Sequence, residues 1–279
     1  MRELNKKVFF VIGSGRCGTR AFYKMLAGHK KVEIHHEYLC THVQPLGVLY
    51  YMGLKSKEEI VEKLKEIYLS AVLYSDKEIF IDCSHKLTWL IEPLLEIFPQ
   101  AKFVALVRDG RKVVASFYYK LKDEIYDDES TTKLIKWCLN GAKELPPPSE
   151  KKYWWNIPPK NHPFHNAFLS FDRFKRICYH WQESYSEILE KKKLFDERIK
   201  LVKLEELIRD KKILKEIFDF MGLPFKDIYF EFWKKPKHVF FPLDFKLTPE
   251  QETVFWEMCG EVMERLGYNR KEKQYEVNY

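Results

Sequence analysis

The sequence predicts an α/β protein, a three-layer sandwich in which helices cover both faces of a central, mostly parallel sheet of about five strands. Short apolar runs alternate with amphipathic helical segments along the chain. The first apolar run leads into a Gly-rich turn and then a helix, which makes the fold P-loop-like. Of the 279 residues 46% are hydrophobic, and only 11 Gly and 13 Pro are present, so we expect an ordered globular chain.

The predicted strands are short apolar runs that end in polar or turn residues. They comprise 8–12, 32–37, 78–82, 101–107 and 199–203. The first of them is unbroken, which is typical of a strand buried on both faces of a parallel sheet. The predicted helices comprise 21–26, 56–73, 88–98, 112–121, 166–193, 211–221 and 249–267. The chain has no internal repeat, and we expect a single domain over 1–279.

The turn at 13–20 reads GSGRCGTR and lies between the first strand and the first helix. Backbone N–H groups in such a turn, together with the helix dipole, favour an anion. Its Gly-x4-Gly spacing is that of a P-loop, but Thr19 and Arg20 replace the Lys-Ser/Thr pair that serves a metal-bound triphosphate. Arg16 lies inside the turn instead. The pattern indicates a phosphate cradle without metal, and the alternative is a tight turn with an incidental arginine.

A second basic turn follows the predicted strand 101–107. Arg108-Asp109-Gly110-Arg111 leads into a helix that carries Ser116 two turns along. The planar guanidinium of arginine is suited to phosphate or sulfate. We therefore expect a second anion contact here, and a solvated turn is the alternative.

Polar residues end the second predicted strand, where ligands sit in open α/β sheets. They are His35, His36 and Glu37, with Cys40 and His42 close behind. This spacing matches no standard zinc motif, so we expect no metal.

The stretch 145–168 is rich in proline and aromatic residues and has no helical or strand period. A long segment of this kind is either a linker or functional. We favour a lid or acceptor-binding loop, in which Trp154 and Trp155 offer stacking surfaces for a ring.

Charge and composition narrow the classes of partner. The net charge of +7 suits an anionic ligand, but no nucleic-acid fingerprint is present. No apolar run reaches the 18 residues that a membrane span needs. Six cysteines without a secretory signal predict reduced thiols and a cytoplasmic protein.

Four stretches together resemble the sulfotransferases that use 3′-phosphoadenosine 5′-phosphosulfate (PAPS). Residues 13–19 are similar to the loop that holds the 5′-phosphosulfate, and 98–111 with Ser116 to the segment that holds the 3′-phosphate. Residues 201–207, followed by Gly-Leu-Pro at 222–224, resemble a third shared segment, and 247–268 resembles the C-terminal helix. Arg16 and the Asp-Gly-Arg at 109–111 point toward carbohydrate- or protein-acting and bacterial-type members.

The resemblance implies metal-independent transfer of a sulfuryl group from PAPS to a hydroxyl or amine. Arg16 would stabilise charge on the leaving bridging oxygen. The implied donor-binding residues are Ser14, Gly15, Arg16, Cys17, Gly18, Thr19, Arg20, Arg108 and Ser116. A last basic contact with the 3′-phosphate is expected within 234–246, where the match is poor. The acceptor is open between a carbohydrate, a lipid, a small alcohol or phenol and a protein tyrosine.

The resemblance offers two candidates for the base that takes the acceptor proton. Glu37 resembles the glutamate of glycan- and protein-acting members, and His85 resembles the histidine of cytosolic members. We favour Glu37. The rival function is a P-loop kinase-like phosphotransferase, which would need the Lys-Ser/Thr pair after Gly18. A nucleic-acid-binding module is more remote and would need a basic stripe with stacking aromatics.

Overall fold

The computed structural model describes residues 6–234 and 246–271, and its centre is a parallel sheet of five strands. The strands are β1 (Lys7–Ile12), β2 (Val32–His36), β3 (Ile79–Cys83), β4 (Lys102–Val107) and β5 (Ile199–Lys203). Their order is β2-β3-β1-β4-β5, and every neighbouring pair is parallel. This confirms the predicted α/β class, the parallel sheet and the number of strands.

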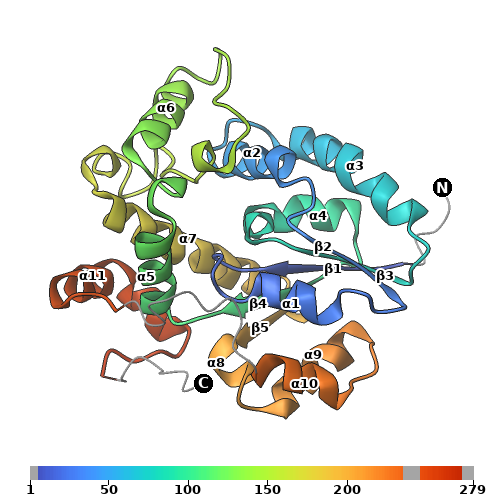
Figure 1. Cartoon of the computed structure of the whole chain (residues 1–279). Helices are drawn as coiled ribbons and strands as arrows, with labels where there is room; N and C mark the ends of the chain where they lie inside the picture. Colours follow the sequence, from blue (N-terminus) through green and yellow to red (C-terminus); the bar gives the residue numbers. More distant parts are fainter. Residues whose placement is uncertain (1–5, 235–245, 272–279) are drawn as a thin grey trace.

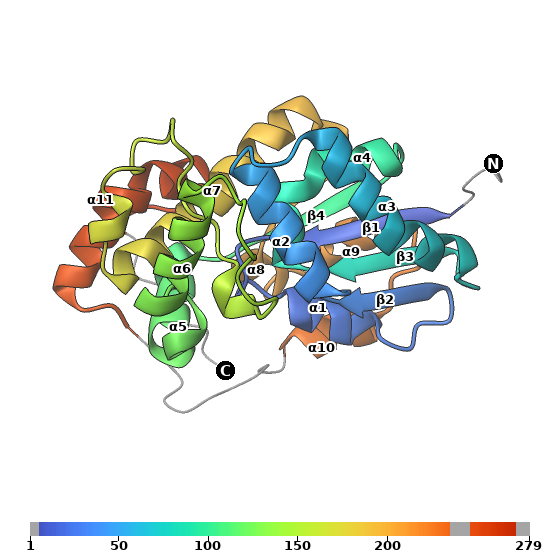
Figure 2. The same cartoon turned by 90° about the horizontal axis from the view of Figure 1, so that it is seen from above.

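Helices cover both faces of the sheet (Figures 1 and 2). Successive side chains of a strand point to opposite faces, so an apolar strand such as β1 contributes to a core on each side. Phe10 and Ile12 of β1 belong to the larger core, which they share with α3 (Lys57–Tyr74) and α4 (Ile91–Ile97). Phe9 and Val11 belong to the second core, on the opposite face. There they pack with α1 (Thr19–Leu26), α9 (Lys211–Met221) and α10 (Asp227–Lys234).

A further group of helices lies beyond the carboxyl ends of the strands, on the left in Figure 1. It comprises α5 (Gly110–Lys120), α6 (Asp128–Leu139), α7 (Arg173–Leu194) and α11 (Pro249–Arg265). The segment 145–168 runs beside this group and contains the short 3-10 turn η3 (Lys151–Tyr153). All five strands therefore end facing the same group of helices, and the turns that follow the strands meet there.

The helices differ from the prediction in three ways. The helices α2 (Cys40–Tyr51), α6, the short α8 (Leu204–Leu207) and α10 were not predicted, and α2 contains Pro45 and Gly47, which are poor helix formers. The predicted helix 88–98 begins earlier, as the 3-10 turn η1 (His85–Leu90), and continues as α4. Finally, α7 starts at Arg173, where Asp172 accepts a hydrogen bond from the backbone N–H of Lys175, and not at 166.

All six cysteines are free thiols. Within the two described stretches, no helix is both long and apolar enough to cross a membrane.

Candidate active site at the carboxyl ends of the strands

The Gly-rich loop between β1 and α1 is shaped by glycines that no other residue could replace without displacement of its neighbours. A Cβ on Gly13, which has a φ of 152°, would lie 2.6 Å from both Cys17 Sγ and the carbonyl oxygen of Leu106. The hydroxyl of Thr88 accepts from the Gly13 N–H at 3.2 Å and donates to its carbonyl at 3.0 Å. Thr88 therefore anchors the loop to η1, a contact that no pattern in the sequence indicates.

The side chains of Ser14 and Cys17 point into the protein. Both are fully buried, and the Ser14 hydroxyl lies 3.3 Å from the hydroxyl of Tyr185. The Ser14 carbonyl accepts a hydrogen bond from Nε2 of His180 at 2.8 Å. Burial, followed by the charges of Lys86 and His85, lowers the pKa of His180 to about 3, so its ring is neutral. Since these two side chains face inward, their contribution to an anion site comes from the backbone.

The two basic turns found in the sequence lie side by side. Arg16 Nε donates to the hydroxyl of Ser116 at 3.0 Å, and Arg108 donates to the carbonyl of Arg16 at 3.0 Å. Burial, followed by the charge of Arg108, lowers the pKa of Arg16, and Arg20 acts in the same direction. Burial and the charges of Arg16 and Arg108 also lower the pKa of Lys120. Positive charges that disfavour one another in this way form a site suited to an anion.

Lys120 was missed at the sequence level, although it lies one helical turn beyond Ser116 on α5. Arg111, in contrast, takes part in the structure of the second turn. It is buried and pairs with Asp109 at 2.6 Å. Glu205, after β5, accepts from the Asp109 N–H and from the hydroxyl of Tyr268, both at 2.9 Å. These buried contacts fix the turn from which Arg108 projects.

The two candidate bases contact each other. β2 and β3 are neighbours, and the Glu37 N–H donates to the Cys83 carbonyl at 3.1 Å just past the end of the paired register. Glu37 Oε1 lies 3.3 Å from Nδ1 of His85, and Glu37 Oε2 contacts Nζ of Lys151. Both partners of the Glu37–His85 pair are shielded, with side-chain exposures of 13% and 11%. The sequence placed each residue after its own strand, and the strand order brings them together.

The surroundings give this pair unequal proton affinities. Burial alone would raise the pKa of Glu37, but hydrogen bonds and charges from His85 and Lys151 outweigh it and lower that pKa. Burial, followed by the charge of Lys86, lowers the pKa of His85 to about 4. Glu37 is therefore an ionised carboxylate with both oxygens engaged, and His85 is a neutral imidazole. His85 Nε2 is buried and has no hydrogen-bond partner among the described residues.

Asp82, the penultimate residue of β3, supports the turn that carries Glu37. Its carboxylate accepts from the Tyr38 N–H at 3.2 Å and from the hydroxyl of Tyr68 at 2.7 Å. Burial raises the pKa of Asp82 to about 7. Glu37 itself has a φ of 57°, in the left-handed region, and the anchored Tyr38 N–H fixes that conformation. In the sequence, the only indication of this role is that Asp82 is an acidic residue within an otherwise apolar predicted strand.

The tryptophans of 145–168 are both buried and differ in their surroundings. Trp154 packs against Trp137 with ring centroids 5.5 Å apart and donates to the Pro148 carbonyl at 2.7 Å. Trp154 therefore packs in the core and does not offer the exposed stacking surface that we expected. Trp155 stacks on His85 at 5.8 Å, and Lys86 Nζ lies 3.4 Å from the centroid of its ring. Trp155 therefore covers the candidate base.

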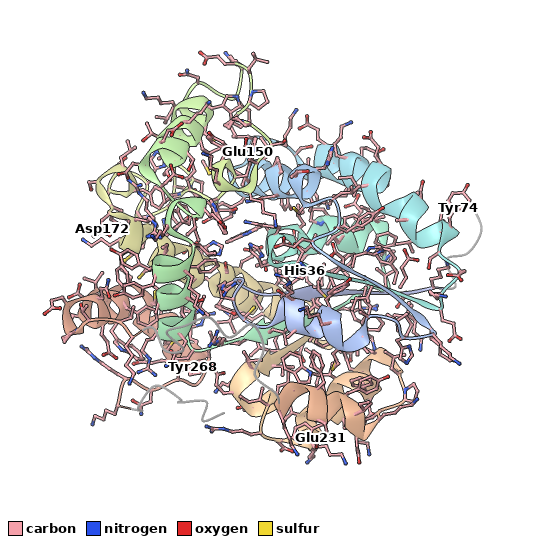
Figure 3. All side chains as sticks on the ribbon, in the orientation of Figure 1. His36, Tyr74, Glu150, Asp172, Glu231 and Tyr268 are labelled. Atoms are coloured by element: carbon pink, nitrogen blue, oxygen red, sulfur yellow. The ribbon has the colours of Figure 1, made fainter. Side chains whose placement is uncertain are left out.

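A cavity of about 570 Å³ opens at the carboxyl end of β2. It is lined by Arg20, Tyr23, Ile34, His35, His36, Glu37, Tyr38 and Lys151. In Figure 3 the labelled His36 lies between α1 and α2, with Glu150 farther out beside α2. No group of three or more His, Cys, Asp or Glu side chains in the described part of the chain is placed to hold a metal ion. The expected last phosphate contact within 234–246 falls almost entirely outside the described residues.

Comparison with known proteins gives one consistent family. The family model described as "Sulfotransferase family" matches residues 9–140. A sulfotransferase from Alicyclobacillus acidocaldarius is 14% identical, with a TM-score of 0.54 and 94% of each chain covered. Sulfotransferase STF9 from Mycobacterium avium is 12% identical, with a TM-score of 0.55 over 96% of this chain and 79% of that one. A search of curated proteins gives no match.

At such low identity the two solved structures show a shared fold. The family match is more specific, because residues 9–140 contain the Gly-rich loop, the Glu37–His85 pair and the turn from Arg108 to Ser116. Lys151 and the two tryptophans of 145–168 lie beyond the matched segment. The family match over the site and the shared fold make this chain similar to the sulfotransferases.

Proposed function

We propose that the protein transfers a sulfuryl group from PAPS to a hydroxyl or amine of an acceptor, without a metal ion. One observation carries the proposal. A cluster of cations around a Gly-rich loop adjoins a buried Glu–His pair at the same edge of the sheet. The first feature suits a nucleotide with phosphate and sulfate groups, and the second suits removal of a proton from an acceptor.

In this proposal, the backbone N–H groups of 14–19 hold the 5′-phosphosulfate, and Arg108 with Ser116 holds the 3′-phosphate. Arg16 stabilises the charge that develops on the bridging oxygen as the phosphate leaves. A sulfuryl group carries less charge than a phosphoryl group. Fixed cations and backbone dipoles therefore suffice where a kinase would need Mg²⁺, in keeping with Thr19 and Arg20 in place of the Lys-Ser/Thr pair.

The geometry changes our preference for the base from Glu37 to His85. Accepting a proton would require Glu37 to give up contacts that lower its pKa, whereas Nε2 of His85 is a free acceptor. The acceptor oxygen forms its bond to sulfur as the bond from sulfur to the bridging oxygen breaks, and the acceptor proton moves to Nε2. Glu37 accepts from Nδ1–H, fixes the tautomer and stabilises the imidazolium that forms. Glu37 is then a positioning residue.

Calorimetry with 3′,5′-ADP, the product of the donor, tests the proposal. We expect binding in the presence of a chelator, because only protein groups hold the nucleotide. Adenosine 5′-monophosphate, which lacks the 3′-phosphate, should bind more weakly. A preference for ATP with Mg²⁺ over 3′,5′-ADP would overturn the proposal and favour the kinase-like alternative.

A further inference from the structure

We infer that the cavity at the end of β2 is the acceptor site and that Arg20 selects acceptors with a hydroxylated ring and a negatively charged group. The inference rests on the proposed function and adds the chemical class of the acceptor. It also moves Arg20 from the donor-binding residues, where the family resemblance placed it, to the acceptor side.

The position of the cavity makes it the entry to the proposed catalytic pair. Glu37 and Lys151 form part of its wall, and His85 contacts Glu37 at 3.3 Å without lining the cavity itself. Arg20 stands in the first turn of α1, immediately after the Gly-rich loop, and also lines the cavity. A molecule held here would thus contact Arg20, at the start of α1, on one side and Glu37, the partner of the proposed base, on the other.

The charges of the cavity leave one cation uncompensated. Glu37 and Lys151 form an ion pair with each other. Arg20 is exposed, and it makes no hydrogen bond or ion pair with any other residue in 6–234 or 246–271. Its charge acts on Arg16, which places it near the donor loop. A carboxylate, sulfate or phosphate on the acceptor would supply the missing partner, and a guanidinium binds such groups through two hydrogen bonds.

The aromatic walls indicate a ring between the charged group and the reacting hydroxyl. The rings of Tyr23 and His36 have centroids 6.0 Å apart, and those of His35 and Tyr38 are 4.7 Å apart. His35 is also held by an ion pair with Glu33 at 2.9 Å. Aromatic side chains with polar edges suit a sugar or an aryl ring that carries hydroxyl groups.

The test compares matched acceptors that differ only in charge, with PAPS as donor. Each pair consists of a negatively charged carboxylate and the corresponding neutral amide. The two carboxylates are 4-hydroxyphenylacetate and glucuronate. We expect the wild-type protein to prefer the charged member of at least one pair. Arg20→Gln should lower kcat/KM for that member roughly 10- to 100-fold through its KM, since a charged hydrogen-bonded pair is lost. Turnover of the amide should stay within about threefold of the wild-type value.

Lys24→Gln is the matched control, because Lys24 lies one turn further along α1, is exposed and does not line the cavity. It should leave both members of each pair unchanged. An equal loss for the charged acceptor and the amide in Arg20→Gln, together with weaker 3′,5′-ADP binding, would return Arg20 to the donor site. Binding of 3′,5′-ADP without turnover of any charged acceptor would also overturn the inference. Failure to bind 3′,5′-ADP at all would instead overturn the proposed function.

Discussion

The proposed donor and acceptor sides of this site are built in opposite ways. On the donor side, Arg16 and Arg108 approach each other across two turns, and burial together with the charge of Arg108 lowers the pKa of Arg16. On the acceptor side, the carboxylate of Glu37 is paired with Lys151 and also contacts the neutral His85. The first arrangement suits a fixed polyanion, and the second preserves an imidazole that can accept a proton.

Because of this contrast, we expect the two sides to respond differently to the loss of a cation. Removing a cation from the donor side takes away a partner of the nucleotide. Removing a cation from the acceptor side changes the proton affinity of a neighbour, since Lys86 lowers the pKa of His85.

The largest effect should come from the proposed base. We expect His85→Asn to lower turnover at saturating donor about 1,000-fold, within the range for general base catalysis. Glu37→Gln should lower it by a smaller factor, because a Gln carbonyl can still accept from Nδ1–H while the negative charge is lost. Steady-state turnover of both variants, with one acceptor, makes the comparison.

Binding of 3′,5′-ADP is the control for both variants, because neither residue is assigned to the donor. It should match the wild-type value. If His85→Asn were to keep near-normal turnover while Glu37→Gln was inactive, Glu37 would be the base and the roles within the pair would be reversed.

The next largest effect should come from the donor side. Arg16→Met should lower turnover roughly 100-fold, the range seen when one preorganised group that stabilises developing charge is removed. Affinity for 3′,5′-ADP should fall less, because the loop backbone remains in place. Measurement of kcat and of 3′,5′-ADP affinity separates the two quantities. Unchanged kcat would show that the cation acting on the bridging oxygen lies elsewhere.

The donor side was also the more predictable one from sequence. Its parts are contiguous, with a strand, a Gly-rich turn and a helix in the first 26 residues and an arginine turn after 101–107. The fold could also be predicted from contiguous segments, because the five strands are short apolar runs with helices between them. The helix α2 escaped prediction because Pro45 and Gly47 are poor helix formers, and only tertiary packing explains its stability.

The acceptor side depends on contacts between distant segments, which a single sequence does not specify. Glu37 and His85 become partners because β2 pairs with β3, an adjacency that the predicted strands left open. Lys151 reaches Glu37 from 114 residues away. The burial of Trp154 depends in part on Trp137, which lies in the helix α6 that was not predicted. The sequence therefore identified the two candidate bases but did not show that Glu37 and His85 contact each other.

The smallest expected effect, a shift in pH dependence, tests the electrostatics of the acceptor side. In the proposed mechanism His85 must be neutral, so kcat/KM falls as His85 gains a proton at low pH. Burial, followed by the charge of Lys86, lowers the pKa of His85 to about 4, well below the ordinary value of 6.5. Removal of the Lys86 charge therefore raises this pKa. The acid limb of the kcat/KM profile should then move to higher pH in Lys86→Met.

Methionine is close to lysine in length and can keep contact with the ring of Trp155, on which Lys86 Nζ lies. The profile is measured from about pH 3 to 8 in wild type, Lys86→Met and Lys24→Met, so that the range includes the His85 pKa of about 4. Thermal unfolding at both ends of the range checks that each protein stays folded. Lys24→Met should leave the acid limb in place, because Lys24 is exposed on α1 and is not among the charges that act on His85. An acid limb that stays fixed or moves to lower pH in Lys86→Met would show that a group other than His85 limits the rate at low pH. It would also contradict the proposal that the acceptor side depends on a neutral His85.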